Sequence, residues 1–346
     1  MNSELSHASP LRAAARLNAR PGNAALLALV LAGAVALAFL LSNYHLFQLT
    51  MVVVYAIAVL GLNLVTGYNG QISLGHGAFY AVGAYVTAIL MNNYDIPYWA
   101  TLLPSAVICG AVGFAVGLPA LRLEGHYLAL TTFALAVAVP QLLKAHGLED
   151  WTGGVQGIVI SKPDPPFGLP LSPDQWLYLF TLAVAAALFL VGWNLVRGRT
   201  GRAMKAIRDH SLAAEAMGID IARCKTQTFA VSAMFAGIAG SLGAIAVQFV
   251  APDSFTFILS ITLFVGLVVG GIASIAGAVF GALFIVFVPN LAGDLSRGAH
   301  GAVYGAILIA CLYLMPLGVA GLARGLIARL LARRSGRVAL AGQGQI

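Results

Sequence analysis

The stretch GYNGQISLGHGAFYAVGAY, residues 67–85, decides how the rest of the chain is interpreted. Its glycines and polar residues interrupt what would otherwise be one long apolar run. Because glycine disfavours a continuous helix, we expect a broken element here, with the break at Gly67, Gly70, Gly75 and Gly77. The stretch alone fits a catalytic loop, a phosphate-binding loop or an interruption in a transmembrane helix.

The composition of the whole chain favours the membrane. Of 346 residues, 60% are hydrophobic and only 9% are charged, and the mean hydropathy is +0.90. A soluble domain carries roughly 25% charged residues, so most of the surface of this protein must contact lipid. We therefore predict an all-α fold, a polytopic transmembrane helical bundle.

Apolar runs of about 17–25 residues are long enough to cross a bilayer as helices. Ten such runs are present, but only residues 270–272 separate the eighth from the ninth, so eight to ten spans are expected. The predicted spans are 23–41, 47–66, 78–94, 98–118, 126–143, 175–195, 226–249, 255–270, 273–291 and 301–318.

The positive charges predict the orientation of these spans, because cytoplasmic loops are enriched in Lys and Arg. With both termini in the cytoplasm, only Lys144, Lys162 and Arg297 of the 19 Lys and Arg residues lie outside. The net charge of +7 is then explained by membrane topology, and we expect no binding of nucleic acid.

The same pattern divides the chain into three parts. Residues 1–22 form a cytoplasmic N-terminal tail, residues 23–318 the transmembrane domain, and residues 319–346 a basic cytoplasmic tail near lipid headgroups. The transmembrane domain carries a polar outer loop at 144–174 and a charged cytoplasmic loop at 196–225.

The cytoplasmic loop is either a solvated connection or a docking site for another protein. Good helix formers followed by Gly218 predict one short helix over 201–220. The string AAEAMGI, residues 213–219, resembles the EAA…G coupling loop of ABC importer permeases, which docks on a cytoplasmic ATPase. This resemblance implies a coupling role for Arg208, Asp209, Ala214, Glu215, Ala216 and Gly218.

Further stretches, in chain order, resemble the permeases of branched-chain amino-acid ABC importers, the LivH/LivM family. The resemblance covers about residues 60–325, and TGGVQGI is similar to an outer-loop motif of the LivM branch. The stretches are GQISLGHGAFYAVGAY, LRLEGHYLALTTFA (121–134), TGGVQGI (152–158), FAVSAMFAGIAGSLGA (229–244), SFTFILSITLFVGLVVGGIASIAGAVFGALF (254–284) and LMPLGVAGL (314–322).

The resemblance implies a permease subunit of an ATP-driven importer, multi-pass in a bacterial inner membrane. Its solute would be a branched-chain amino acid or a related small molecule, since relatives also serve urea, amides and aromatic acids. The implied partners are two ABC ATPase subunits, a second homologous permease and a periplasmic or extracellular solute-binding protein. No GxxxxGK[ST] occurs, so ATP would be bound by the ATPase, and no cofactor is expected in this chain.

Polar residues inside the predicted spans are candidates for the translocation path. A polar group in hydrocarbon must be hydrogen-bonded, so it faces either protein or a water-filled cavity. Such groups line a path or tie closely packed helices together, and both interpretations stay open, although for His76 we favour a structural role. The candidates are Asn63, Asn69, Gln71, Ser73, His76, Thr131 and Thr132.

Two other functions compete with an ATP-driven permease. The first is an ATP-independent channel or secondary carrier for a small polar solute, but no acid lies deep in a predicted span to couple protons or sodium. The second is a membrane enzyme, but the histidines are scattered and the three cysteines are far apart. We therefore expect neither a catalytic set nor a metal site.

Overall fold

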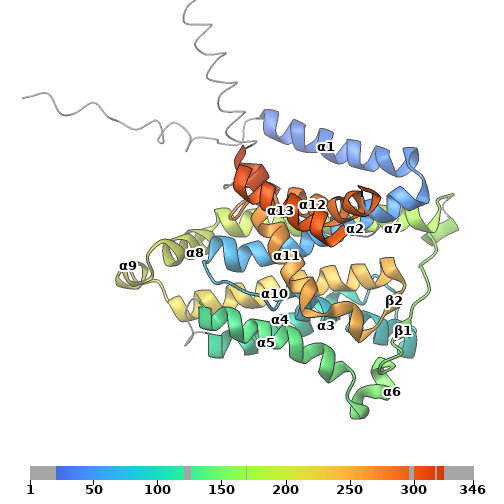
Figure 1. Cartoon of the computed structure of the whole chain (residues 1–346), viewed down its shortest axis with the longest axis horizontal. Coiled ribbons are helices and arrows are strands. Elements are labelled where there is room, and N and C mark those ends of the chain that lie inside the picture. The colour runs from blue at the N-terminus through green and yellow to red at the C-terminus, as the bar shows by residue number, and fades with distance from the viewer. Residues whose placement is uncertain (1–20, 121–125, 169, 296–299, 316–317, 323–346) are drawn as a thin grey trace, which may run out of the picture.

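The computed structural model describes residues 21–120, 126–168, 170–295, 300–315 and 318–322. Most of the predicted N-terminal tail and of the C-terminal basic tail lie outside these residues, as does the segment 121–125. The described chain is mostly helical (Figure 1). Both termini were predicted to be cytoplasmic, and that remains a prediction.

Each of the ten predicted spans overlaps one long helix. Alternating runs of apolar residues and polar turns produce these helices, since only an internally hydrogen-bonded backbone is stable in lipid. Their bounds are α1 Pro21–Leu40, α2 Asn43–Leu62, α3 His76–Tyr94, α4 Leu102–Ala120, α5 His126–Leu143, α7 Pro173–Arg197, α10 Ile221–Val247, α11 Phe257–Gly270, α12 Ile275–Leu295 and α13 His300–Leu314.

By length and apolarity, five helical segments of the described residues qualify as membrane spans, or six if a bent pair counts as one. The bent pair joins Tyr127–Leu143 to His146–Thr152 at 65°, and shorter apolar helices lie within α1, α4 and α13. The protein is thus a polytopic membrane protein, and the count of eight to ten spans remains a prediction. The five are Asn43–Tyr68, Pro173–Arg197, Ile221–Val247, Pro252–Gly270 and Ile275–Gly293.

The two predicted spans at 255–270 and 273–291 are two helices, α11 and α12, that pack against each other. A short 3-10 helix, η5 (Pro252–Phe255), precedes α11. A Cβ atom on Gly270 would lie 2.0 Å from the carbonyl oxygen of Gly277. Glycine at this crossing therefore lets the two backbones approach each other closely.

The central helix is α10, which packs against α2, α3 and α4 and is buried along most of its length. Its small residues face the neighbouring backbones. A Cβ atom on Gly240 would lie 1.9 Å from the carbonyl oxygen of Tyr80 in α3, and one on Gly237 would lie 2.5 Å from the sulfur of Cys109 in α4. The core is therefore built on close helix contacts between small residues.

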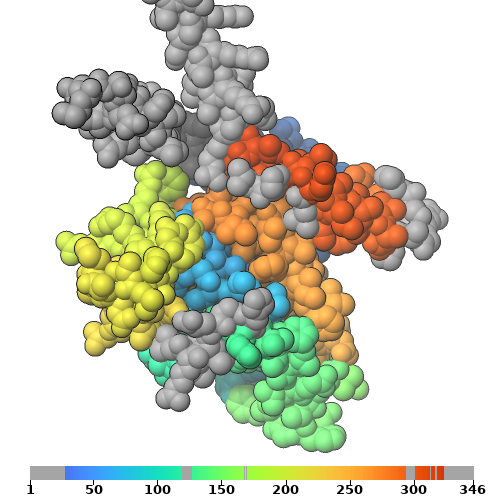
Figure 2. Space-filling model, turned by 60° about the vertical axis from the view of Figure 1, so that its left-hand side comes forward, coloured from blue at the N-terminus to red at the C-terminus, as the bar shows by residue number. Residues whose placement is uncertain are grey.

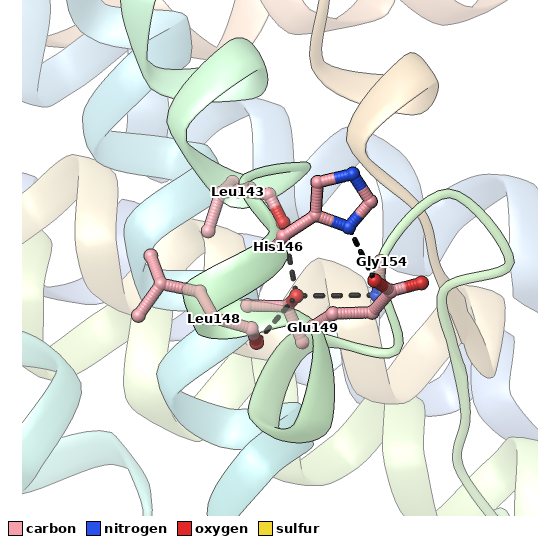
Figure 3. Close-up of polar contacts among 6 residues, drawn as sticks. Leu143, His146, Leu148, Glu149 and Gly154 are labelled. Atoms are coloured by element: carbon pink, nitrogen blue, oxygen red, sulfur yellow. Dashed lines mark hydrogen bonds and ion pairs between the residues drawn. The ribbon is translucent and has the colours of Figure 1, made fainter.

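The loop predicted to lie outside, 144–174, contains short elements: η3 His146–Leu148, α6 Glu149–Thr152, β1 Ile158–Val159 and η4 Pro166–Gly168. Strand β1 pairs antiparallel with β2 (Phe249–Val250), which follows α10. The hydroxyl of Thr152 shares its proton between the carbonyl oxygens of Leu143 and Leu148 and accepts from the N–H of Gly154 (Figure 3). These bonds fix the turn that leads out of α5.

The two polar loops lie at opposite ends of the molecule. Helices α8 (Arg199–Asp209) and α9 (Ser211–Ala216) are at one end of the bundle, while α6, β1 and β2 are at the other (Figure 1). Only α7 separates the two loops along the chain. This arrangement fits the prediction that they lie on opposite sides of a membrane.

Candidate functional site

The α2–α3 connection is interrupted, as predicted from its glycines. Helix α2 continues into one π-helical turn, η2 (Asn63–Tyr68), and α3 begins at His76. Gly70 has a φ of +75°, a left-handed conformation that suits glycine. Gly75 is the N-cap of α3, whereas Gly67 and Gly77 lie in the helical turns on either side. The break itself therefore covers residues 69–75.

The glycines at the edges of the break make room for other helices. A Cβ atom on Gly75 would lie 2.7 Å from the carbonyl oxygen of Thr132 in α5. One on Gly77 would lie 2.6 Å from the hydroxyl of Ser260 in α11, which accepts from the N–H of Gly77. The break is therefore enclosed by α5 and α11.

The side chain of Asn63 is hydrogen-bonded to the turn between α11 and α12. Its side chain is fully buried, its Nδ2 donates to the carbonyl oxygen of Ser274 at 2.8 Å, and its Oδ1 accepts from the N–H of Ala273 at 2.9 Å. A Cβ atom on Gly67 would lie 1.9 Å from that Oδ1. Asn63 and Gly67 therefore form one unit that holds two distant segments together.

His76 lies in a chain of hydrogen bonds that joins α2, α3 and α10. The hydroxyl of Ser232 donates to the carbonyl oxygen of Gly61, so its oxygen accepts from Nε2 of His76 at 2.6 Å. Because Nε2 then carries the proton, Nδ1 accepts from the hydroxyl of Ser73 at 3.0 Å. Both ring nitrogens of this buried histidine are satisfied within the protein, which favours the structural role predicted for it.

Thr131 and Thr132 occupy different positions. Thr132 donates to the carbonyl oxygen of Ala129 in its own helix and accepts from the N–H of Leu74, so it joins the enclosure of the break. The hydroxyl of Thr131 bonds back to the carbonyl oxygen of Tyr127, and the residue is exposed. Thr131 thus lies away from the polar cluster.

The bonded pair of Asn69 and Gln71 contains an unused hydrogen-bond acceptor. Nδ2 of Asn69 donates to Oε1 of Gln71 at 2.9 Å, and both residues are buried. The Oδ1 atom of Asn69 is buried without a hydrogen-bond partner among the residues that the structure describes. An unpartnered buried oxygen is costly, so this pair is the part of the cluster best suited to bind a solute or water.

Sequence reasoning missed the hydroxyl partners of this cluster. Ser232 and Ser260 are buried, and their hydroxyls lie more than 150 positions from the residues they bind. Ser274 binds Asn63, 211 positions away, through its main-chain carbonyl oxygen. Thr87 likewise binds both Ser105 and Ser241, which joins α3 to α4 and α10. An isolated hydroxyl within an apolar span was the available signal. Among the described residues, no three His, Cys, Asp or Glu side chains form a metal site.

The loop 196–225, which is predicted to be cytoplasmic, contains two helices, so the prediction of one helix over 201–220 is wrong. Helix α8 ends at Asp209 and α9 starts at Ser211, because the ring of His210 accepts from the N–H of Ala213 and caps a new helix. Gly218 follows the end of α9 with a φ of +82°, and the N–H of Ile219 bonds to the carbonyl oxygen of Ala214. The glycine stop predicted at Gly218 is confirmed.

The end of this loop exposes apolar side chains. Leu212 is 71% exposed and Met217 is 83% exposed, while Ala214 is buried and Glu215 and Ala216 are exposed. Beside them is an open hollow of about 480 Å³, lined by Glu215, Gly218, Ile219, Asp220, Ile221, Ala222 and Lys225. The loop therefore carries an apolar tip beside an acidic residue and a hollow, which together are suited to contact another protein.

A bundle of apolar helices with an interrupted helix inside it is the architecture of a membrane transport protein. A family model described as the permease component of branched-chain amino acid transport systems matches residues 44–312. The chain belongs to this family. It is thus a multi-pass membrane permease of a bacterial ABC importer, a transport subunit without a catalytic domain.

Curated relatives agree with the family assignment. The chain is 32% identical to the high-affinity branched-chain amino acid permease LivM of Salmonella typhimurium LT2 over 315 residues, which cover 84% of this chain and 73% of LivM. LivM of Escherichia coli K12 is 33% identical with the same coverage. LivH of Escherichia coli K12 is 27% identical over 77% of this chain and 91% of its own. No solved structure matches the chain significantly.

Proposed function

We propose that this chain forms half of the translocation path of an importer for branched-chain amino acids. A second homologous permease would form the other half, two ATPases would bind on the cytoplasmic side, and a solute-binding protein would deliver the solute. The names of the LivM and LivH relatives support the substrate class. ATP would be bound by the ATPases, so this chain needs no cofactor.

The exposed tip of the α8–α9 loop is the observation that carries the ATP-driven mechanism. Leu212 and Met217 are large apolar side chains on a solvent-facing helix, where they would be buried only by a partner. Glu215 and the hollow beside it give the surface shape and charge. A channel or secondary carrier needs no such surface.

Within the membrane, we assign different roles to the predicted path residues. Asn69 and Gln71 would face the solute, because the Oδ1 atom of Asn69 has no hydrogen-bond partner among the described residues and Gln71 is bonded to the same side chain. Asn63, Ser73, His76 and Thr132 would position this segment, since their hydrogen bonds stay within the protein. ATP-driven closure of the ATPases would then rock the helices between outward-open and inward-open states.

Transport by the purified complex tests this function. The importer, isolated through a tag on this chain, is placed in proteoliposomes with ATP inside and the binding protein outside. We expect ATP-dependent uptake of labelled leucine, with competition by isoleucine and valine and little by urea, short amides or aromatic acids. Uptake that is equal without ATP would support the alternative of a channel or secondary carrier.

Variants of the tip test the docking surface. Met217→Asp and Glu215→Ala should each reduce co-purification of the ATPases and ATP-dependent uptake at least tenfold, since truncation of a buried interface anchor costs about 2 kcal/mol or more. Arg202→Gln, an exposed change in α8, is the matched control. If both tip variants retain normal ATPase binding and uptake, this loop is not the docking surface.

A further inference from the structure

Arg208, at the last turn of α8, binds the interrupted helix directly. Its Nη1 donates to the carbonyl oxygen of Gly67 at 3.0 Å. Its Nε and Nη2 both donate to Oδ1 of Asp209, at 3.0 and 2.9 Å. Asp209 thereby fixes the guanidinium in an orientation that leaves Nη1 for Gly67.

The carbonyl oxygen of Gly67 is free to accept a hydrogen bond from a cationic side chain of another element. It lies at the C-terminal end of the helix formed by α2 and η2, where the last carbonyl oxygens lack partners in their own helix. The N–H of Gln71, the residue four positions after Gly67, donates to the carbonyl oxygen of Val65 and not to that of Gly67. The negative end of the helix dipole also favours a positive charge at this place. Arg208 therefore caps this helix from another element of the chain.

The α2–α3 connection also packs tightly against the aliphatic part of the Arg208 side chain. A Cβ atom on Gly70 would lie 2.8 Å from Cγ of Arg208, so Gly70 supplies both the left-handed turn and the space. One turn earlier in α8, Nζ of Lys205 lies 5.6 Å from the ring centre of Tyr68, within cation–π range. In Figure 2 the yellow surface of α8 and α9 borders the blue surface of the α2–α3 connection.

Two backbone hydrogen bonds bridge the break between α8 and the exposed tip. Met204 and Ile207 bury one face of α8 in the core. The N–H of His210 bonds to the carbonyl oxygen of Ala206, and the N–H of Ala214 bonds to the carbonyl oxygen of His210. Displacement of α9 is therefore expected to move the end of α8, and Arg208 with it.

We propose that Arg208 is a positioning residue that couples movement of the α8–α9 tip to the interrupted helix, by holding the carbonyl oxygen of Gly67. A displacement of Arg208 would move Gly67 and, through it, Asn63, which is bonded to the α11–α12 turn. The same displacement would reach Asn69 and Gln71 along the backbone. This inference rests on the proposed function, in which an ATPase docks on the tip.

The ratio of ATP hydrolysed to leucine transported, measured in proteoliposomes that hold the complete importer, tests this coupling. Arg208→Gln should raise the ratio about tenfold, because one charge-assisted bond to the interrupted helix is lost. Arg208→Lys keeps the charge at the helix end and should restore part of the coupling. Arg202→Gln removes an arginine of the same helix whose one hydrogen bond among the described residues goes to the carbonyl oxygen of Arg197, and it should leave the ratio unchanged.

A second measurement needs neither partner nor solute. Hydrogen exchange of the isolated permease should become faster at residues 67–73 in Arg208→Gln, with α10 unaffected. A wild-type ratio together with unchanged exchange would overturn the proposal, as would equal effects of Arg208→Gln and Arg202→Gln. If the wild-type complex binds no ATPase or transports no leucine, the proposed function fails, and the exchange measurement still decides whether Arg208 holds this segment.

Discussion

At the scale of single residues, glycines of this protein serve two separate purposes. Gly240 provides space, because a Cβ atom there would lie 1.9 Å from the carbonyl oxygen of Tyr80. Gly218 provides a conformation, because its φ is +82° while nothing lies within 4 Å of the Cβ position. We predict that Gly240→Ala costs about 1–3 kcal/mol through overpacking, and Gly218→Ala about 1–2 kcal/mol through left-handed strain.

The midpoint temperature of thermal unfolding, measured in detergent, checks the predictions for Gly240→Ala and Gly218→Ala. Gly33→Ala is the control, because Gly33 lies in α1 with an ordinary φ and nothing within 4 Å. We expect no loss of stability in Gly33→Ala. Replacement of Gly240 by serine should be at least as harmful as alanine, whereas Gly218→Asn should be milder than Gly218→Ala, since Asn tolerates the left-handed region. The opposite order at either position would refute its assigned purpose.

At the scale of elements, apolar run length was enough to locate every long helix. The sequence did not reveal the π-helical turn η2, the split between α8 and α9 at His210, or the β1–β2 pair. Two of these features involve contacts between distant parts of the chain: Asn63 with the α11–α12 turn, and β1 with β2 after α10. A single sequence carries no information on such pairs. The split at His210 is local, since its ring accepts from the N–H of Ala213, but a histidine cap is an uncommon signal.

In the candidate site, the sequence predicted which residues are polar within the apolar region but not the role of each. The polar residues of the break were identified because they stand out between apolar runs. Their roles were not resolved, because a buried histidine with two satisfied nitrogens and one that faces a solute look the same in sequence. For His76 the distant partner Ser232, which lies in α10, favours the structural interpretation.

The link between Asn63 and the α11–α12 turn gives an element-scale prediction. Asn63→Leu leaves the carbonyl oxygen of Ser274 and the N–H of Ala273 without their buried partner, at a cost of about 1–3 kcal/mol for each group. We expect faster hydrogen exchange at residues 271–274 and a lower midpoint temperature of thermal unfolding. The control is Asn290→Leu, because the exposed side chain of Asn290 bonds, among the described residues, only to the carbonyl oxygen of Val286 in its own helix. Equal effects of the two variants would show that the link does not hold the turn.

At the scale of the whole molecule, the orientation in the membrane depends on one helix. The loops 144–174 and 196–225 are separated only by α7, which has 25 residues and a length of about 37 Å, enough to cross a bilayer. We therefore expect them to lie on opposite sides, whatever the total number of spans. The excess of Lys and Arg predicts that the second loop lies in the cytoplasm.

Cysteine labelling with a membrane-impermeant maleimide tests this orientation. Val155 and Met217 are exposed and lie in the two loops, while the native Cys109 and Cys224 are buried. We expect Val155→Cys to react in right-side-out vesicles and Met217→Cys only in inside-out vesicles, with the unsubstituted chain as the background for Cys311. Labelling of both from the same side would show that α7 does not cross the membrane. Labelling from the reversed sides would show that the charge asymmetry was misread, and the α8–α9 tip could then not meet a cytoplasmic ATPase.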